Sequence, residues 1–251
     1  MVDFRDYLNS APEKVELNSD AMMKLYYGDM FTIVVGEGDT EKTWYLPKEL
    51  LSHHSEYFKK ACNEGFAEEK EKRIHLKQEN PATFEFFVQY MYSGAYTWRD
   101  SDEMDISGNL MLEEFDAWIM GDFLQANNFK NLAMKHLISY HEETLVRPEA
   151  LSRVYDNTMQ RSLLRKFLIA QMREEIGDGQ YRDAGDRWSD AEHINPELLA
   201  DLFYALQIPM MYFRKPVDSP AIFYDNGEIG VGRSRSWDDL DSRDRSSKSR
   251  N

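Results

Sequence analysis

The chain has 251 residues, of which 42% are hydrophobic and 30% are charged, so it has enough apolar content for one or two buried cores. Its formal net charge of −15 opposes binding of the folded part to nucleic-acid phosphates, and it has neither an apolar run of membrane-spanning length nor a secretory signal pattern. The single cysteine, Cys62, excludes an internal disulfide. We therefore expect an intracellular protein, cytoplasmic or nuclear, whose folded part binds neither membranes nor nucleic acid directly.

The first part of the chain is predicted to form a small sheet with helices. Apolar and β-branched runs bounded by turn residues predict strands, and a proline before an apolar stripe of helical spacing predicts a helix start. The expected elements are, in chain order, a short helix near residues 21–26, strands at 30–35 and 43–46, a helix from Pro47 toward Cys62, and a strand at 73–76. The turn residues between the first two strands indicate a hairpin.

The chain from residue 80 to residue 213 is predicted to be largely helical. Asn80-Pro81 predicts a helix start, because an asparagine side chain caps a first turn that proline tolerates, and Ser93-Gly94 predicts its end. After an acidic loop, apolar residues recur at helical spacing in residues 112–123, 129–140, 151–155, 163–172 and 195–206. In the last of these helices the residues expected to be buried are Leu198, Leu199, Leu202, Phe203 and Leu206.

No group of residues predicts catalysis or metal binding. His53 and His54 are adjacent, so on a helix they point about 100° apart and do not share a metal. Cys62 has no histidine at a recognisable spacing and is expected to be a buried thiol. Adjacent acids such as Glu113 and Glu114 are expected on solvated faces, because a catalytic pair needs carboxylates that converge across the fold. We therefore expect no catalytic residue, no metal and no cofactor, and a protein that is not an enzyme.

Three segments, in their order and spacing, resemble the BTB/POZ family. Residues 29–35 are similar to the family's opening strand, with Gly28 in place of serine, and residues 50–58 are similar to its hydrophobic-Leu-x-x-x-Ser-x-x-Phe helix. Residues 84–94 resemble its aromatic helix that ends in Tyr-Ser-Gly. Pro47 departs from the family's usual histidine. The resemblance implies an α+β fold in which a small three-stranded sheet packs with helices.

The flanking segments resemble the fungal-type members of this family, whose BTB/POZ domain continues into an all-helical extension. Leu151-Ser152-Arg153-Val154-Tyr155-Asp156-Asn157-Thr158 followed by Leu163-Leu164-Arg165 is similar to a segment of that extension. We therefore expect four parts, which are a flexible N-terminal segment at residues 1–20, the BTB/POZ domain at 21–141, the helical extension at 142–213, and a disordered Ser/Arg/Asp-rich tail at 214–251.

The resemblance implies a scaffold or adaptor that binds proteins, associates with itself and, as in many members, docks to the cullin scaffold of a ubiquitin ligase. Cullin-docking members carry a hydrophobic-x-Glu element, and Phe66-Ala67-Glu68 stands at the matching position before the predicted third strand. Phe66 would be an apolar anchor in a partner groove, and Glu68 would accept hydrogen bonds at its edge. The alternative is that Phe66 packs on its own core and Glu68 is solvated. Tyr57 and Tyr92 are the other candidate partner-binding residues.

A second function stays open on the sequence, that of a nuclear transcriptional or RNA-processing regulatory subunit. It would act through the BTB/POZ surface and through the Ser/Arg tail, which would engage partners when it is phosphorylated. The alternative for the tail is plain disorder. The chain has no recognisable kelch array or zinc fingers, so in an adaptor the helical region at residues 150–213 would have to bind the substrate.

Overall fold

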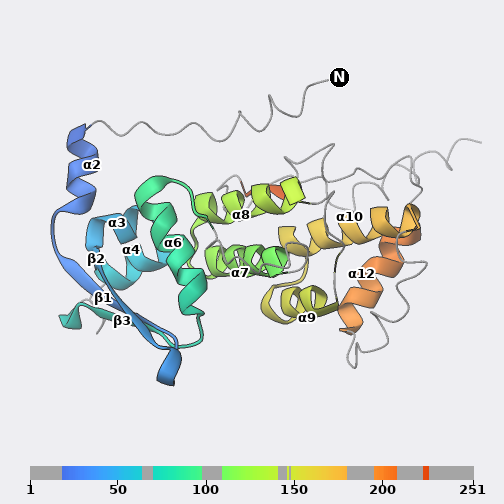
Figure 1. Ribbon diagram of the computed structural model, residues 1–251, viewed down its shortest axis with the longest axis horizontal. Helices are drawn as coiled ribbons and strands as arrows, with labels where there is room; N and C mark the ends of the chain where they lie inside the picture. Colours follow the sequence, from blue (N-terminus) through green and yellow to red (C-terminus); the bar gives the residue numbers. More distant parts are fainter. Residues whose placement is uncertain are drawn as a thin grey trace, which may run out of the picture.

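The computed structural model describes residues 19–63, 70–97, 109–140, 146, 148–179, 195–207 and 223–225. The molecule is elongated, with a small sheet and its helices at one end and a purely helical part at the other (Figure 1). The elements of the first part are α2 (Ser19–Tyr26), β1 (Met30–Val35), η1 (Gly38–Thr40), β2 (Lys42–Pro47), α3 (Lys48–His54), α4 (Glu56–Asn63), β3 (Arg73–Leu76) and α6 (Pro81–Ser93). They are followed by α7 (Asn109–Phe123), α8 (Asn127–Tyr140), α9 (Pro148–Asn157), α10 (Leu163–Gly177) and α12 (Pro196–Gln207).

The three strands form one sheet in the order β2-β1-β3, in which β1 is antiparallel to β2 and parallel to β3. The predicted hairpin and the predicted third strand are therefore confirmed. Ile33, Val34 and Val35 of β1 are all fully buried, which is the pattern of a central strand covered on both faces. The connection from β2 to β3 includes α3 and α4, and a tight turn could not make it because the two strands lie on opposite sides of β1.

The helix expected from Pro47 toward Cys62 is in fact two helices, α3 and α4, that are separated by Ser55. Ser55 has an extended backbone (φ −146°, ψ 122°), so the helix stops at this residue and starts again. Its buried hydroxyl donates a hydrogen bond to the Leu124 carbonyl (2.6 Å) and accepts one from the Phe58 N–H (3.1 Å), as a helix N-cap does. The Tyr57 N–H also donates to the Leu124 carbonyl, at 3.3 Å. The start of α4 is thereby fastened to the turn between α7 and α8.

Helix α6 has the ends that the sequence predicts. The Asn80 side chain accepts a hydrogen bond from the Ala82 N–H (2.8 Å), Pro81 occupies the first turn, and Gly94 ends the helix with a left-handed backbone (φ 74°). The buried face of α6 is aromatic. The ring centre of Phe87 on this face lies 6.3 Å from the ring centre of Phe58 on α4. Aromatic pairs at such distances add to the stabilisation from burial alone.

Phe129 of α8 is fully buried and connects the helices to one another. Its ring lies 5.2 Å from Phe87, 5.4 Å from Tyr90 and 5.4 Å from Tyr96. Helices α7 and α8 pack closely, since a Cβ built on Gly121 would lie 3.1 Å from the backbone of Lys130. The hydrophobic core is continuous from the sheet through α8 into α10.

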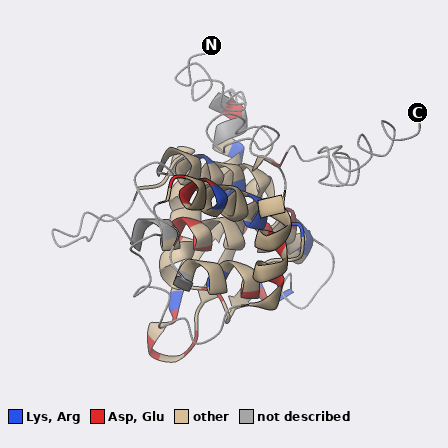
Figure 2. Cartoon of the chain, turned by 90° about the vertical axis from the view of Figure 1, so that its right-hand side faces the viewer, with Lys and Arg blue, Asp and Glu red and all other residues tan. Residues whose placement is uncertain are grey.

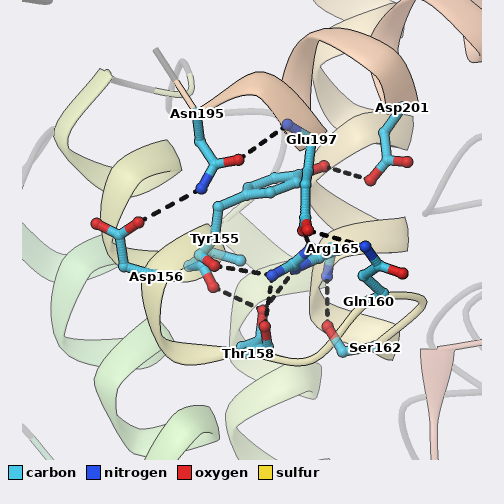
Figure 3. Close-up of polar contacts among 10 residues, drawn as sticks. Tyr155, Asp156, Thr158, Gln160, Ser162, Arg165, Asn195, Glu197 and Asp201 are labelled. Atoms are coloured by element: carbon cyan, nitrogen blue, oxygen red, sulfur yellow. Dashed lines mark hydrogen bonds and ion pairs between the residues drawn. The ribbon is translucent and has the colours of Figure 1, made fainter. Parts of the chain in front are cut away.

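Helices α9, α10 and α12 are joined by a cluster of polar contacts around the buried Arg165 (Figure 3). Its guanidinium lies 4.4 Å from the ring centre of Tyr155 and donates hydrogen bonds to the carbonyls of Tyr155 and Thr158. It also donates to Glu197 of α12, and this hydrogen bond lowers the pKa of the Glu197 carboxyl. The Tyr155 hydroxyl donates to Asp201, one turn further along α12, at 2.9 Å. The residues that resemble a fungal-type segment therefore hold α12 against α9 and α10.

The prediction that five apolar residues of α12 share one buried face is wrong. Leu198 is buried and Leu202 is half-buried, whereas Leu199, Phe203 and Leu206 are 53%, 69% and 47% exposed. The reason is the pair of polar contacts made by Glu197 and Asp201, which fix the rotation of the helix about its own axis. Two apolar stripes then remain on α12, and only one of them faces the core.

At Phe223–Asp225 the structure differs from the expectation of a disordered tail that begins at residue 214. Phe223 is 2% exposed, and its ring lies 5.8 Å from that of Phe167 on α10. Asp225 contacts Lys130 and Asn131 of α8. An aromatic residue followed two positions later by an acid supplies an apolar anchor and a countercharge, and composition alone does not reveal such a pair within a polar segment. The other residues of the expected tail lie outside the described part of the chain.

Replacement of Ser55 by alanine is expected to lower the free energy of unfolding by about 2 kcal/mol, since it removes the cap of α4 and the donor to the buried Leu124 carbonyl. Ser52→Ala is the matched control, because the Ser52 hydroxyl oxygen is buried and has no hydrogen-bond partner among the described residues. Urea unfolding of the two variants measures the difference. Equal midpoints would contradict the role of Ser55.

Candidate protein-interaction surface

The four residues predicted to bind a partner do not all fall within the described part of the chain. Phe66 and Glu68 lie outside it, between α4 and β3. Tyr57 lies in the first turn of α4, and Tyr92 lies near the end of α6. Tyr57 is half-buried and Tyr92 is exposed.

Tyr57 forms an aromatic pair with Phe123, the last residue of α7. The ring centres are 5.1 Å apart, and Phe123 is exposed although its spacing predicted a place in the apolar stripe of its helix. Phe123 is at the surface because α7 ends there, and the next residue, Leu124, turns into the core instead. The hydrogen bonds of Ser55 to the same turn hold the two rings together. We call this pair the Tyr57–Phe123 pair.

Tyr92 lies against the N-terminal helix rather than standing alone. Its ring stacks on that of Tyr26 in α2, with ring centres 5.7 Å apart and an angle of 5° between the planes. Partial burial and the neighbouring Tyr26 raise the pKa of the Tyr92 hydroxyl, so it is a neutral hydrogen-bonding group at physiological pH. Tyr26 also packs against the hydrophobic core, which fixes the inner face of α2.

The outer side of α2 and the start of β1 carry exposed apolar residues that the sequence analysis missed. Met23, Tyr27 and Met30 are 46%, 67% and 46% exposed, and we call these three residues the α2 surface. Met23 and Tyr27 are four residues apart and share one helical face, since the Tyr27 N–H donates a hydrogen bond to the Met23 carbonyl (3.2 Å). This spacing was the available signal in the sequence. The α2 surface lies at the end of the molecule opposite α12 (Figure 1).

One of the two acids that were expected on a solvated face is buried in the core. Glu114 of α7 is fully buried, where it accepts a hydrogen bond from the Tyr96 hydroxyl and lies 2.8 Å from Nδ1 of His136. Burial raises the pKa of its carboxyl, while the contacts with His136 and Tyr96 oppose that shift. These partners come from α8 and from the segment after α6, so sequence spacing gave no sign of them. The contacts with Tyr96 and His136 thus satisfy a carboxyl group that is buried in the core.

The described residues offer no arrangement for metal chemistry. His54 is partly buried, and this burial, with a smaller effect of His53, lowers its pKa to about 4. Its ring is therefore neutral at physiological pH, and the ring centre lies 5.3 Å from that of Tyr90. Among the described residues there is no group of three or more potential metal ligands. Acidic and basic residues are interspersed on the face at the α12 end of the molecule (Figure 2). Within the same described ranges, no helix has the length and apolarity needed to cross a membrane.

Comparison with known proteins agrees with the architecture. No curated protein sequence matched the chain. The model of the BTB/POZ domain family matches residues 27–137, a range that begins before β1, contains the whole sheet, and ends within α8. Domains of this family mediate protein–protein contacts, including self-association. Residues 27–137 of this chain are therefore a BTB/POZ domain.

Proposed function

We propose that the chain is a non-catalytic adaptor that associates with a second copy of itself through the α2 surface. The observation that carries this proposal is the exposure of Met23, Tyr27 and Met30 within one short segment at the end of the molecule. Tyrosine and methionine are enriched in the centres of protein interfaces, whereas exposed apolar residues elsewhere on a surface usually occur singly. A two-fold symmetric pair would place each α2 surface against its counterpart.

Rigidity of the inner face of α2 supports the same proposal. The Tyr26–Tyr92 stack and the packing of α2 on α3 hold the helix before any partner arrives. A surface that is already ordered loses less conformational entropy on binding. The net charge of −15 opposes the approach of two copies, so association should strengthen as salt is raised to physiological levels.

In this adaptor one part of the chain would associate with a second copy, and another part would bind a different protein. Residues 21–141 would form the former, and the helical extension at residues 142–213 would bind the protein that the adaptor delivers. The exposed stripe of α12, made of Leu199, Phe203 and Leu206, supports this assignment because it presents apolar side chains on a helix whose rotation is fixed.

Light scattering at micromolar concentration and physiological salt tests self-association. We expect twice the chain mass of 29.5 kDa for the wild type, and the monomer mass for the double variant Met23→Glu/Tyr27→Glu, because two buried carboxylates on each copy would face one another. Met159→Glu is the matched control, since Met159 is 84% exposed between α9 and α10 and its replacement should leave the mass doubled. A monomeric wild type would overturn the proposal.

Docking to a cullin is the second function that we propose, and the Tyr57–Phe123 pair favours it. The pair joins the start of α4 to the end of α7, and Phe66-Ala67-Glu68, the segment that resembles a cullin-docking element, follows α4 in the sequence. An aromatic pair, an apolar anchor and an acid that met the same partner would form an interface with an apolar centre and a polar rim.

Recovery of the chain on an immobilised cullin tests this second proposal. The double variant Phe66→Ala/Glu68→Ala should be recovered at least roughly tenfold less than the wild type, as expected for loss of an anchor worth more than about 1.4 kcal/mol. The single variant Phe123→Ala should also reduce recovery. The double variant Met23→Glu/Tyr27→Glu, designed to prevent self-association, shows whether recovery on the cullin depends on self-association. Equal recovery of wild type and Phe66→Ala/Glu68→Ala, or none of either, would reject cullin docking.

A further inference from the structure

Residues 223–225 contact α8 and α10 through the Phe223 ring and through both the backbone and the side chain of Asp225. The Asn131 side chain donates a hydrogen bond from Nδ2 to the Asp225 carbonyl (2.7 Å) and accepts one at Oδ1 from the Asp225 N–H (2.7 Å). The carboxamide of Asn131 thus hydrogen-bonds both the N–H and the carbonyl of Asp225. Such contacts do not depend on the side chain that is bound, so they fix the position and direction of a backbone rather than its sequence.

Lys130 makes the site specific for a negatively charged residue. It lies next to Asn131, whose two hydrogen bonds to the Asp225 backbone we call the backbone clamp. Its side chain is only 7% exposed, and its Nζ lies 2.7 Å from Oδ2 of Asp225 and 2.8 Å from Oδ1 of Asp122. Burial acts to lower the pKa of Lys130, but the hydrogen bonds that its ammonium donates to the two carboxylates raise it above its usual value. The ammonium also lies 5.2 Å from the ring centre of Trp118. Because Asp122 belongs to α7, the buried cation would keep a countercharge if Asp225 left.

Phe223 provides the apolar anchor. Its ring is almost completely buried and stands at 88° to the ring of Phe167, with centres 5.8 Å apart. Phe167 lies on α10 in the extension, whereas Lys130 and Asn131 lie on α8 within the BTB/POZ domain. One short segment therefore spans the seam between the two parts of the molecule, more than ninety residues along the chain from its partners on α8.

We propose that Lys130, Asn131 and Phe167 form a binding site for a short Phe-x-Asp peptide, and that Phe223–Asp225 is a self-ligand that occupies it. The partner is a protein that presents the same pattern, an aromatic residue two positions before a carboxylate. The partner competes with Phe223–Asp225 for the site. The self-ligand therefore sets the concentration of partner that is needed for binding. The site is independent of the α2 surface and does not rest on self-association.

Three features make the site a receptor for a replaceable segment rather than part of the core. The backbone clamp fits any residue that has an N–H and a carbonyl, so a partner peptide satisfies Asn131 equally well. The ion pair with Asp122 keeps Lys130 compensated while the site is empty. The anchor and the acid are two residues apart, so both contacts arise from one short stretch with little ordering cost beyond it.

Binding of a fluorescent peptide with the sequence of residues 220–228 to full-length protein, measured by anisotropy, tests the proposal. The released variant Phe223→Ala/Asp225→Asn should bind the peptide at least roughly tenfold more tightly than the wild type, in which the tethered segment competes at a millimolar effective concentration. Asp225→Asn alone keeps the shape of the segment and removes only the ion pair, so it should give an intermediate affinity even if the double variant folds poorly.

Two further arms decide whether the peptide occupies the proposed site. Asn131→Ala placed in the released variant should abolish binding, and a peptide in which the residue equivalent to Asp225 is asparagine should bind the released variant at least about tenfold more weakly. Thermal unfolding of each protein confirms that it is folded. The proposal is overturned if the peptide binds neither Phe223→Ala/Asp225→Asn nor Asp225→Asn, or if it binds these two variants and the wild type equally. It is also overturned if Asn131→Ala, placed in the released variant, leaves binding unchanged.

Discussion

The position of α8 depends on the burial of Phe129, and most of the functional geometry depends on α8. The ring of Phe129 packs against aromatic side chains of α6 and against Tyr96, so one face of α8 is held in the hydrophobic core. The next two residues, Lys130 and Asn131, consequently lie where the extension meets the domain and where Phe223–Asp225 binds. A smaller side chain at position 129 would loosen the core and the peptide site together, because adjacent residues of one helix serve both.

The α2 surface and the peptide site lie at different places along the length of the molecule and differ in character. The α2 surface is apolar and lies at the end that bears the sheet, whereas the site of Lys130, Asn131 and Phe167 combines a clamp, a charge and an aromatic wall. The first is suited to an identical copy, since it has no charge that would select another partner. The second is suited to a defined peptide. The Arg165 cluster joins the helices of the extension, so that α10, which contributes Phe167, is held by both α9 and α12.

Much of the fold could be predicted from the sequence, because the governing signals are local. The strand at residues 30–35, the caps of α6 and the helices from α7 to α12 follow from alternation, helical spacing and cap residues close in sequence. The break at Ser55, the burial of Glu114 and the rotation of α12 could not be predicted, since each is decided by a partner from a distant segment. The same limit applies to the candidate sites. Tyr57 and Tyr92 were identified as members of motifs, but the partners Phe123 and Tyr26 emerged only from the packing.

Association of this BTB/POZ protein through the α2 surface can be measured on the unmodified chain by hydrogen exchange at two protein concentrations. Amides of residues 19–30 should exchange more slowly in concentrated than in dilute solution, because a bound second copy would cover the α2 surface and make local opening of α2 rarer. Amides of α12 should exchange at the same rate in both. If exchange of residues 19–30 is independent of concentration over a range that extends well above micromolar, the chain does not associate through the α2 surface.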